Sequence, residues 1–170
     1  MQRRTVLLWG QAGLSSWLLA GCGFKLRGPQ KYNFSSLGVL PSPGGPLTIQ
    51  LRRSFGDSIQ VLTPETPLTQ AQVLLEILQE QREKTVVALN SSGQVREFQL
   101  RIRVKFKVRT PQGEELTPET EIVQKRDISF NESAVLAKEA EEAMLYRDMQ
   151  TDIVQQLMRR LATVPYAASP

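Results

Sequence analysis

The chain has 170 residues, a formal net charge of +4 and 41% hydrophobic residues, which suits one globular domain with a single core. It contains no histidine and a single cysteine, which excludes serine–histidine and cysteine–histidine catalysis, histidine-ligated zinc or haem, and a disulfide within the chain. Because no nucleotide-binding, metalloprotease or calcium-loop motif is present either, we expect a protein that is not an enzyme and needs no metal or cofactor; an enzyme that uses carboxylates alone is the least favoured alternative.

The N-terminal segment has the order of a secretory signal peptide. Arg3 and Arg4 precede a short apolar stretch that ends in Leu19-Ala20-Gly21-Cys22 and is too short and too polar for a stable membrane span. In bacterial lipoproteins the cysteine of such a box receives diacylglycerol, is cleaved on its N-terminal side and is then N-acylated, commonly with palmitate. We predict a lipoprotein-type signal peptide over residues 1–21 and a lipid anchor on Cys22, with an ordinary signal peptide as the alternative.

The residue after this cysteine indicates which of the two membranes holds the anchor. Gly23 stands where many enteric lipoproteins carry an aspartate that retains them in the inner membrane. We therefore expect the periplasmic side of the outer membrane. The arginine pair leaves general secretion and twin-arginine export both open.

Residues 29–46 are rich in proline and glycine around one apolar run, Leu37 to Leu40. Such a composition predicts a linker, a short strand and a turn.

The next segment begins at Pro46, a residue that suits the first position of a helix. Leu47, Leu51 and Phe55 then recur at every fourth position, which favours a short amphipathic helix. Leu47, Ile49 and Leu51 also alternate, so a strand remains the alternative.

Three longer strands are predicted after this helix. An apolar, β-rich stretch from Ala71 to Leu78 continues through Thr85–Leu89 and stops at the turn Asn90-Ser91-Ser92-Gly93, and a second long strand completes a hairpin. Pro111-Gln112-Gly113 makes another turn, and Glu121–Phe130 supplies the third strand.

The chain ends in a long helix, predicted over residues 133–163 with Asn131 or Ser133 as its N-cap. Its apolar residues repeat every fourth position: Met149, Ile153, Leu157 and Leu161. Strands followed by a terminal helix with one apolar face indicate an α+β fold, with helices packed on one face of a small, mainly antiparallel sheet and the other face uncovered. We expect residues 22–170 to form a single domain.

The second hairpin strand, residues 98–109, alternates strictly between apolar and polar side chains, and from Arg101 onward every polar position is basic. The basic positions are Arg101, Arg103, Lys105, Lys107 and Arg109. They form a line of positive charge about 27 Å long, which repels itself unless acids on neighbouring strands or an anionic ligand neutralise it. Adjoining segments add Arg82, Lys84, Lys125 and Arg126.

Two interpretations of this basic strand are equally favoured: a solvated, edge-protecting face, and a surface for an anionic ligand. The strand carries no outward aromatic side chain on which bases could stack, so we do not expect nucleic acid.

The run Gly21-Cys22-Gly23-Phe24-Lys25-Leu26-Arg27-Gly28 resembles the start of the LptE family of lipopolysaccharide (LPS)-assembly lipoproteins, in which a Gly-Phe-x-Leu-Arg-Gly run follows the lipidated cysteine. The resemblance continues in a hairpin with a Ser-Gly tip, the strand of alternating basic and apolar residues, a turn at Gly113, Lys125-Arg126-Asp127, and Leu136-Ala137-Lys138. The segment from Pro41 to Pro46 departs from the pattern.

This resemblance implies two helices on a four-stranded sheet, seated as a plug inside the outer-membrane β-barrel LptD. It implies that the protein aids assembly of that barrel and delivery of LPS to the cell surface. Cys22 matches the lipid-anchor position, and Arg101, Arg103, Lys105 and Lys107 match the LPS-contacting surface as a pattern. The alternative is a generic periplasmic lipoprotein that binds anionic glycans or lipids without a barrel partner.

Overall fold

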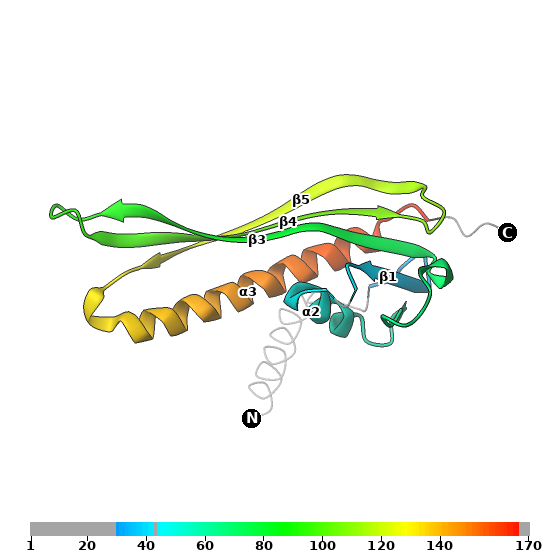
Figure 1. Ribbon diagram of the computed structural model, residues 1–170, viewed down its shortest axis with the longest axis horizontal. Coiled ribbons are helices and arrows are strands. Elements are labelled where there is room, and N and C mark those ends of the chain that lie inside the picture. The colour runs from blue at the N-terminus through cyan, green and yellow to red at the C-terminus, as the bar shows by residue number, and fades with distance from the viewer. Residues whose placement is uncertain (1–29, 43, 167–170) are drawn as a thin grey trace, which may run out of the picture.

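The computed structural model describes residues 30–42 and 44–166 (Figure 1). The strands are β1 (Ser36–Leu40), β2 (Gln60–Val61), β3 (Val73–Leu89), β4 (Val95–Arg109) and β5 (Glu115–Ser129); the helices are α2 (Pro46–Phe55) and α3 (Val135–Ala162), with 3₁₀ turns at Leu68–Gln70 and Glu132–Ala134. The predicted signal peptide, Cys22 and the run from Gly21 to Gly28 lie outside the described residues. Within the described ranges no helix is both long and apolar enough to cross a membrane.

The sheet has five strands in the order β2-β1-β3-β4-β5. The strands from β3 to β5 form an antiparallel meander, whereas β1 runs parallel to both of its neighbours, β2 and β3. The expectation of a four-stranded, mainly antiparallel sheet was therefore wrong in two details. The chain leaves β1 through α2 and re-enters the sheet in the same direction, and the two-residue β2 adds a fifth strand.

The segment from Pro46 to Phe55 is a helix, as preferred over the strand alternative. Leu47, Leu51 and Phe55 are buried, whereas Ile49 is 43% exposed, a distribution that fits a period of four and not of two. The helix ends at Gly56, whose φ of +50° is a conformation that other residues rarely adopt.

The apolar stripe of α3 is confirmed. Met149, Ile153, Leu157 and Leu161 are at most 1% exposed and belong to the main core. The Asn131 side chain accepts a hydrogen bond from the Ser133 amide, so the first of the two predicted caps opens the 3₁₀ turn before α3. The buried residues of α3 all lie from Met149 onward, so the first half of the helix has none.

Both helices cover one face of the sheet, the inner face (Figure 1). α3 runs under β4 and β5, and α2 packs against α3 and β1 at one end of the molecule, the proximal end. The opposite, distal end holds the β3–β4 turn and the start of α3, where α3 alone accompanies the sheet. On the opposite sheet face, the outer face, the described residues place no α-helix (Figure 1). A small cluster of Leu62, Ala71 and Leu74 covers its proximal end.

Candidate ligand-binding surfaces

The alternation of the basic strand is confirmed in β4. Its inner side chains from Leu100 to Val108 are buried against the helices, and its five cations lie together on the outer face. The flanking strands place a carboxylate beside each of them. The pairs are Arg101 with Glu83 (3.4 Å), Arg103 with Glu121 (3.4 Å), Lys105 with Glu119 (3.5 Å), and Lys107 and Arg109 with Glu76 (3.1 and 3.2 Å).

Further acids lie on the same face. Glu115 stands opposite Arg109, and Asp127 stands opposite Gln99 and accepts a hydrogen bond from its amide. Lys125, opposite Arg101, is an additional cation on this side. The outer face is therefore close to electrically balanced, and neighbouring strands supply the counter-charges that the spacing of the cations requires.

These ion pairs are weak and exchangeable. The arginine and lysine side chains involved are 26–38% exposed, and pairs of this kind contribute about 0.2–1 kcal/mol each. The pKa of Glu76 is lowered, chiefly by its hydrogen bond from Arg109 and further by the one from Lys107, whereas desolvation acts in the opposite direction. Within the described ranges the buried Nε of Arg103 donates no hydrogen bond, although it lies within ion-pair distance of Glu121.

The inner face has a second candidate surface at its distal end, the distal pocket. This hollow of about 230 Å³ is lined by Phe98, Ile128, Phe130 and Val135, with Lys84 and Lys138 at its rim. The Lys84 ammonium lies 4.3 Å from the centre of the Phe98 ring and 2.6 Å from Glu142, and that of Lys138 lies 2.8 Å from Glu141. Apolar walls beside cations suit an anionic amphiphile.

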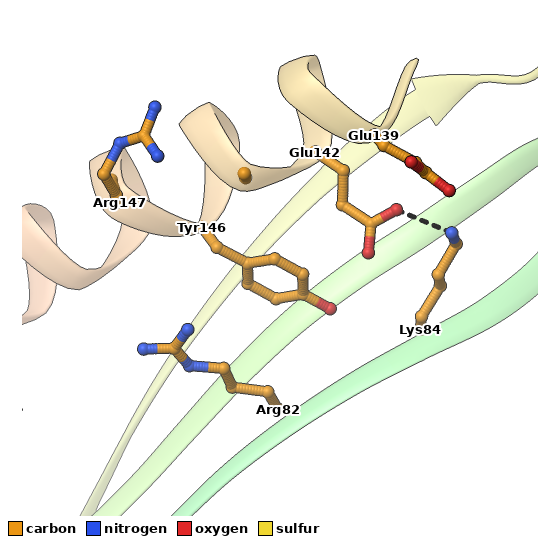
Figure 2. A pocket seen from close by; sticks show the side chains of 7 residues that line it. Arg82, Lys84, Glu139, Glu142, Tyr146 and Arg147 are labelled. Atoms are coloured by element: carbon orange, nitrogen blue, oxygen red, sulfur yellow. Dashed lines mark hydrogen bonds and ion pairs between the residues drawn. The ribbon is translucent and has the colours of Figure 1, made fainter. Parts of the chain in front are cut away.

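A wider hollow of about 500 Å³, the middle hollow, adjoins the distal pocket between β3 and α3. Figure 2 shows Arg82 and Lys84 reaching from β3 toward Tyr146 and Glu142 on α3. The Tyr146 hydroxyl donates a 2.9 Å hydrogen bond to the main-chain carbonyl of Glu83. Burial raises the pKa of this tyrosine, and the Glu142 carboxylate raises it further, so the hydroxyl keeps its proton.

A third hollow of about 510 Å³ lies between α2 and α3 and shares Arg147 with the middle hollow. The three hollows follow one another along α3 and share lining residues, and we refer to them together as the α3 groove. Its cations are Arg53, Arg82, Lys84, Lys138 and Arg147, against the acids Glu139 and Glu142. Glu80 and Glu141 beside the groove pair with Arg82 and Lys138, so its five cations face four acids.

Sequence reasoning did not identify this groove, because its cations come from α2, β3 and widely spaced turns of α3. The one available signal was the alternation of Glu80, Arg82 and Lys84 along β3, which places charge on the helix side of the strand. Arg126 also lies on that side, 2.8 Å from Asp152. Within residues 30–42 and 44–166 no cluster of three acidic, histidine or cysteine side chains is arranged to hold a metal ion.

Comparison with known proteins supplies the remaining finding. The model of the family described as LptE, lipopolysaccharide-assembly, matches residues 30–161. An LPS-assembly lipoprotein LptE of Pectobacterium atrosepticum is 31% identical over 89% of this chain and 83% of its own length, and one of Yersinia enterocolitica is 30% identical over 96% and 78%.

Solved structures share the fold. An uncharacterized lipoprotein B from Nitrosomonas europaea has a TM-score of 0.71 and 34% identity, covering 82% of this chain and 90% of its own. The rare lipoprotein B from Shewanella oneidensis has a TM-score of 0.63 at 20% identity, covering 76% and 95%, and supports the fold alone.

Proposed function

The chain belongs to the LptE family of lipopolysaccharide-assembly lipoproteins, and from this premise we propose that it sits inside the LptD β-barrel of the outer membrane, helps that barrel to assemble and aids delivery of LPS to the cell surface. The family match over residues 30–161 carries the proposal. Residues 1–21 then act as the signal peptide, Cys22 carries the lipid anchor on the periplasmic side, and residues 22–170 form the single functional domain.

The shape of the domain supports a role as a plug. The long β3–β5 meander leaves its outer face free of helices (Figure 1), and the charges on that face are largely neutralised by one another. Val123 on β5, 38% exposed, adds an apolar side chain to that face, and Leu136 on α3, 81% exposed, offers contact area on the helix side. A balanced face with scattered apolar side chains suits an interface whose rim is polar and hydrated.

For the LPS itself we propose phosphate exchange along β4. Phosphate oxygens displace the glutamates from Arg101, Arg103, Lys105 and Lys107, and the weakness of the resident pairs keeps the cost of that exchange small. The distal pocket is a second contact, in which the apolar wall takes part of an acyl chain while Lys84 and Lys138 face phosphate.

Co-purification tests the partner. Membranes are solubilised in mild detergent and the protein is recovered through a C-terminal tag; we expect a large barrel protein at equal stoichiometry. Depletion of this protein should lower the amount of correctly folded barrel, and not its activity alone. Normal barrel levels without co-purification would leave the generic anionic-lipid-binding lipoprotein as the function.

A further inference from the structure

One edge of β3 is open over most of its length. β1 pairs with β3 only up to Glu76, and beyond that point the described residues place no strand on this edge. Pairing with β4 shifts register between Ile77 and Gln79 and again after Val86, so Gln79–Val86 forms an uninterrupted, regular run, the edge segment. Main-chain groups along such a run alternate in direction, and half of them point away from β4, toward the open side. Of the carbonyl groups in this segment, that of Glu83 already accepts a hydrogen bond from the Tyr146 hydroxyl.

The edge segment borders the middle hollow. In the proximal half, α2 occupies the position beside α3 and below β1, but α2 ends before the distal half, where the hollow takes its place. A strand added to this edge lies about 4.8 Å from β3, and alternate side chains of that strand point toward α3. They enter the space lined by Arg82 and Lys84 of the edge segment and by residues of α3, namely Glu139, Glu142, Ala143, Tyr146 and Arg147.

The charges that line the middle hollow indicate the chemistry of the side chains that an added strand would place there. Lys84 forms an ion pair with Glu142 at 2.6 Å. Arg82 forms a longer ion pair with Glu80, at 3.7 Å, and donates a hydrogen bond to the side-chain oxygen of Gln150. Within the described part of the chain Arg147 forms no ion pair, and its side chain borders two hollows. Arg147 is therefore left to attract an anion, and Arg82, held by the long pair with Glu80, can exchange that partner for another carboxylate, although Glu139 and Glu142 also line the hollow. On the outer face the same added strand lies beside the uncharged Gln79, Gln81 and Thr85, and beside Glu83, whose carboxylate is paired with Arg101.

We propose that the edge segment binds an extended segment of a partner protein that carries carboxylate side chains at alternate positions and pairs with β3 as an additional strand. Main-chain hydrogen bonds to the open edge provide the affinity, and the carboxylates facing Arg82 and Arg147 provide the selectivity. A lipid phosphate satisfies the guanidinium groups but leaves the edge amides unpaired, so the structure favours a peptide. The proposal does not depend on the barrel partner.

The test compares two peptides of identical composition on the full-length lipoprotein in neutral detergent. One eight-residue peptide alternates threonine and glutamate; the other has four threonines followed by four glutamates. Amide hydrogen exchange is followed by mass spectrometry at saturating peptide. We expect slower exchange across residues 79–86 with the alternating peptide only. Unchanged exchange with both peptides overturns the proposal, because neither then binds the edge. Equal slowing by both also overturns it, because binding then does not depend on the alternation of the carboxylates.

A matched pair of variants tests whether the charge of Arg147 contributes to peptide binding. Arg147→Gln should weaken binding of the alternating peptide about two- to fivefold, as expected for an exposed ion pair, whereas Arg159→Gln on the same helix but outside the hollows should leave it unchanged. Equal affinities for the two variants contradict the proposal. Phosphatidylglycerol micelles form the last arm: protection of residues 79–86 by these micelles and not by the peptide would assign the edge to a lipid and overturn it.

Discussion

Neutralising the carboxylates beside β4 separates a ligand-binding role of its cations from a purely structural one. Glu83 lies 3.4 Å from Arg101, and Glu121 lies 3.4 Å from Arg103. A phosphate that binds either guanidinium must displace the glutamate first. We therefore expect Glu83→Gln and Glu121→Gln to strengthen LPS binding while they weaken the fold.

The magnitude follows from the exposure of the pairs. The four side chains are 29–39% exposed, and pairs of this kind contribute about 0.2–1 kcal/mol. Each substitution should raise the affinity for LPS by about 1.4- to 5-fold, since about 1.4 kcal/mol corresponds to a factor of ten. Each arginine has its own glutamate, and the sum of the two single effects is a gain of about 2- to 25-fold and a loss of about 0.4–2 kcal/mol of unfolding free energy. A departure of the double variant from this sum measures the coupling between the two arginines, which lie about 6.7 Å apart.

The assay is a titration of fluorescently labelled LPS at about 0.15 M salt, where charges more than about 8 Å from the ligand are largely screened. The control double variant, Glu114→Gln with Asp57→Asn, raises the net charge equally but alters two exposed turn residues that form no ion pair within the described ranges. Equal affinities for the two double variants would refute exchange at Arg101 and Arg103 and make their pairs structural.

Three further predictions concern the core, acid stability and the anchor. Leu157 on α3 is fully buried, so Leu157→Ala should lower the unfolding free energy measured in urea titrations by about 2–5 kcal/mol. Leu157→Met should lower it by less than about 1.5 kcal/mol. Similar losses for both variants would contradict the packing of α3. The Arg109 hydrogen bond depresses the pKa of Glu76, so its stabilisation is complete above the ordinary carboxyl pKa of 4.5 and is lost as pH falls through the lower folded value. Glu76→Gln should remove that part of the acid-induced loss, and urea midpoints that keep the wild-type pH dependence would argue against it. Cys22→Ala with an ordinary cleavage site should release a folded periplasmic protein with unchanged circular dichroism, and intact mass spectrometry of the wild type should find acyl chains; their absence would remove the anchor.

Periodicity predicted the elements that form the main core. Strict alternation located the buried face of β4, and spacing by four located the buried stripe of α3. Both patterns arise because each element buries one continuous face, which leaves a repeat in the sequence itself. The same reasoning favoured a helix over a strand for Pro46–Phe55, where Phe55 extends the period of four, and the structure confirms the helix.

The parallel part of the sheet was missed for a different reason. β1 and β2 are too short for a period to show, so their direction follows only from the α2 crossover between them. β5 begins at Glu115 and not at Glu121, because an edge strand tolerates Pro118 where a central strand would not.

The ion pairs of the outer face were beyond the sequence because they depend on register. Glu83 stands opposite Arg101 only after β3 has absorbed an extra residue between Ile77 and Gln79, and alternation cannot locate such an irregularity. The α3 groove depends in addition on where α2 stops beside α3, which is a property of tertiary packing.

The β3–β4 hairpin reaches beyond the residues that the two helices bury, since Val86, Val87 and Leu89 near its tip are 44–58% exposed. Adding two residues to each strand at this tip preserves the alternation of faces and lengthens the hairpin by about 6.8 Å, whereas an odd insertion in one strand reverses its faces or forces another bulge. The reach of the molecule along its long axis is thus set independently of its core, and insertions or deletions of paired residues can match it to surroundings of different depth.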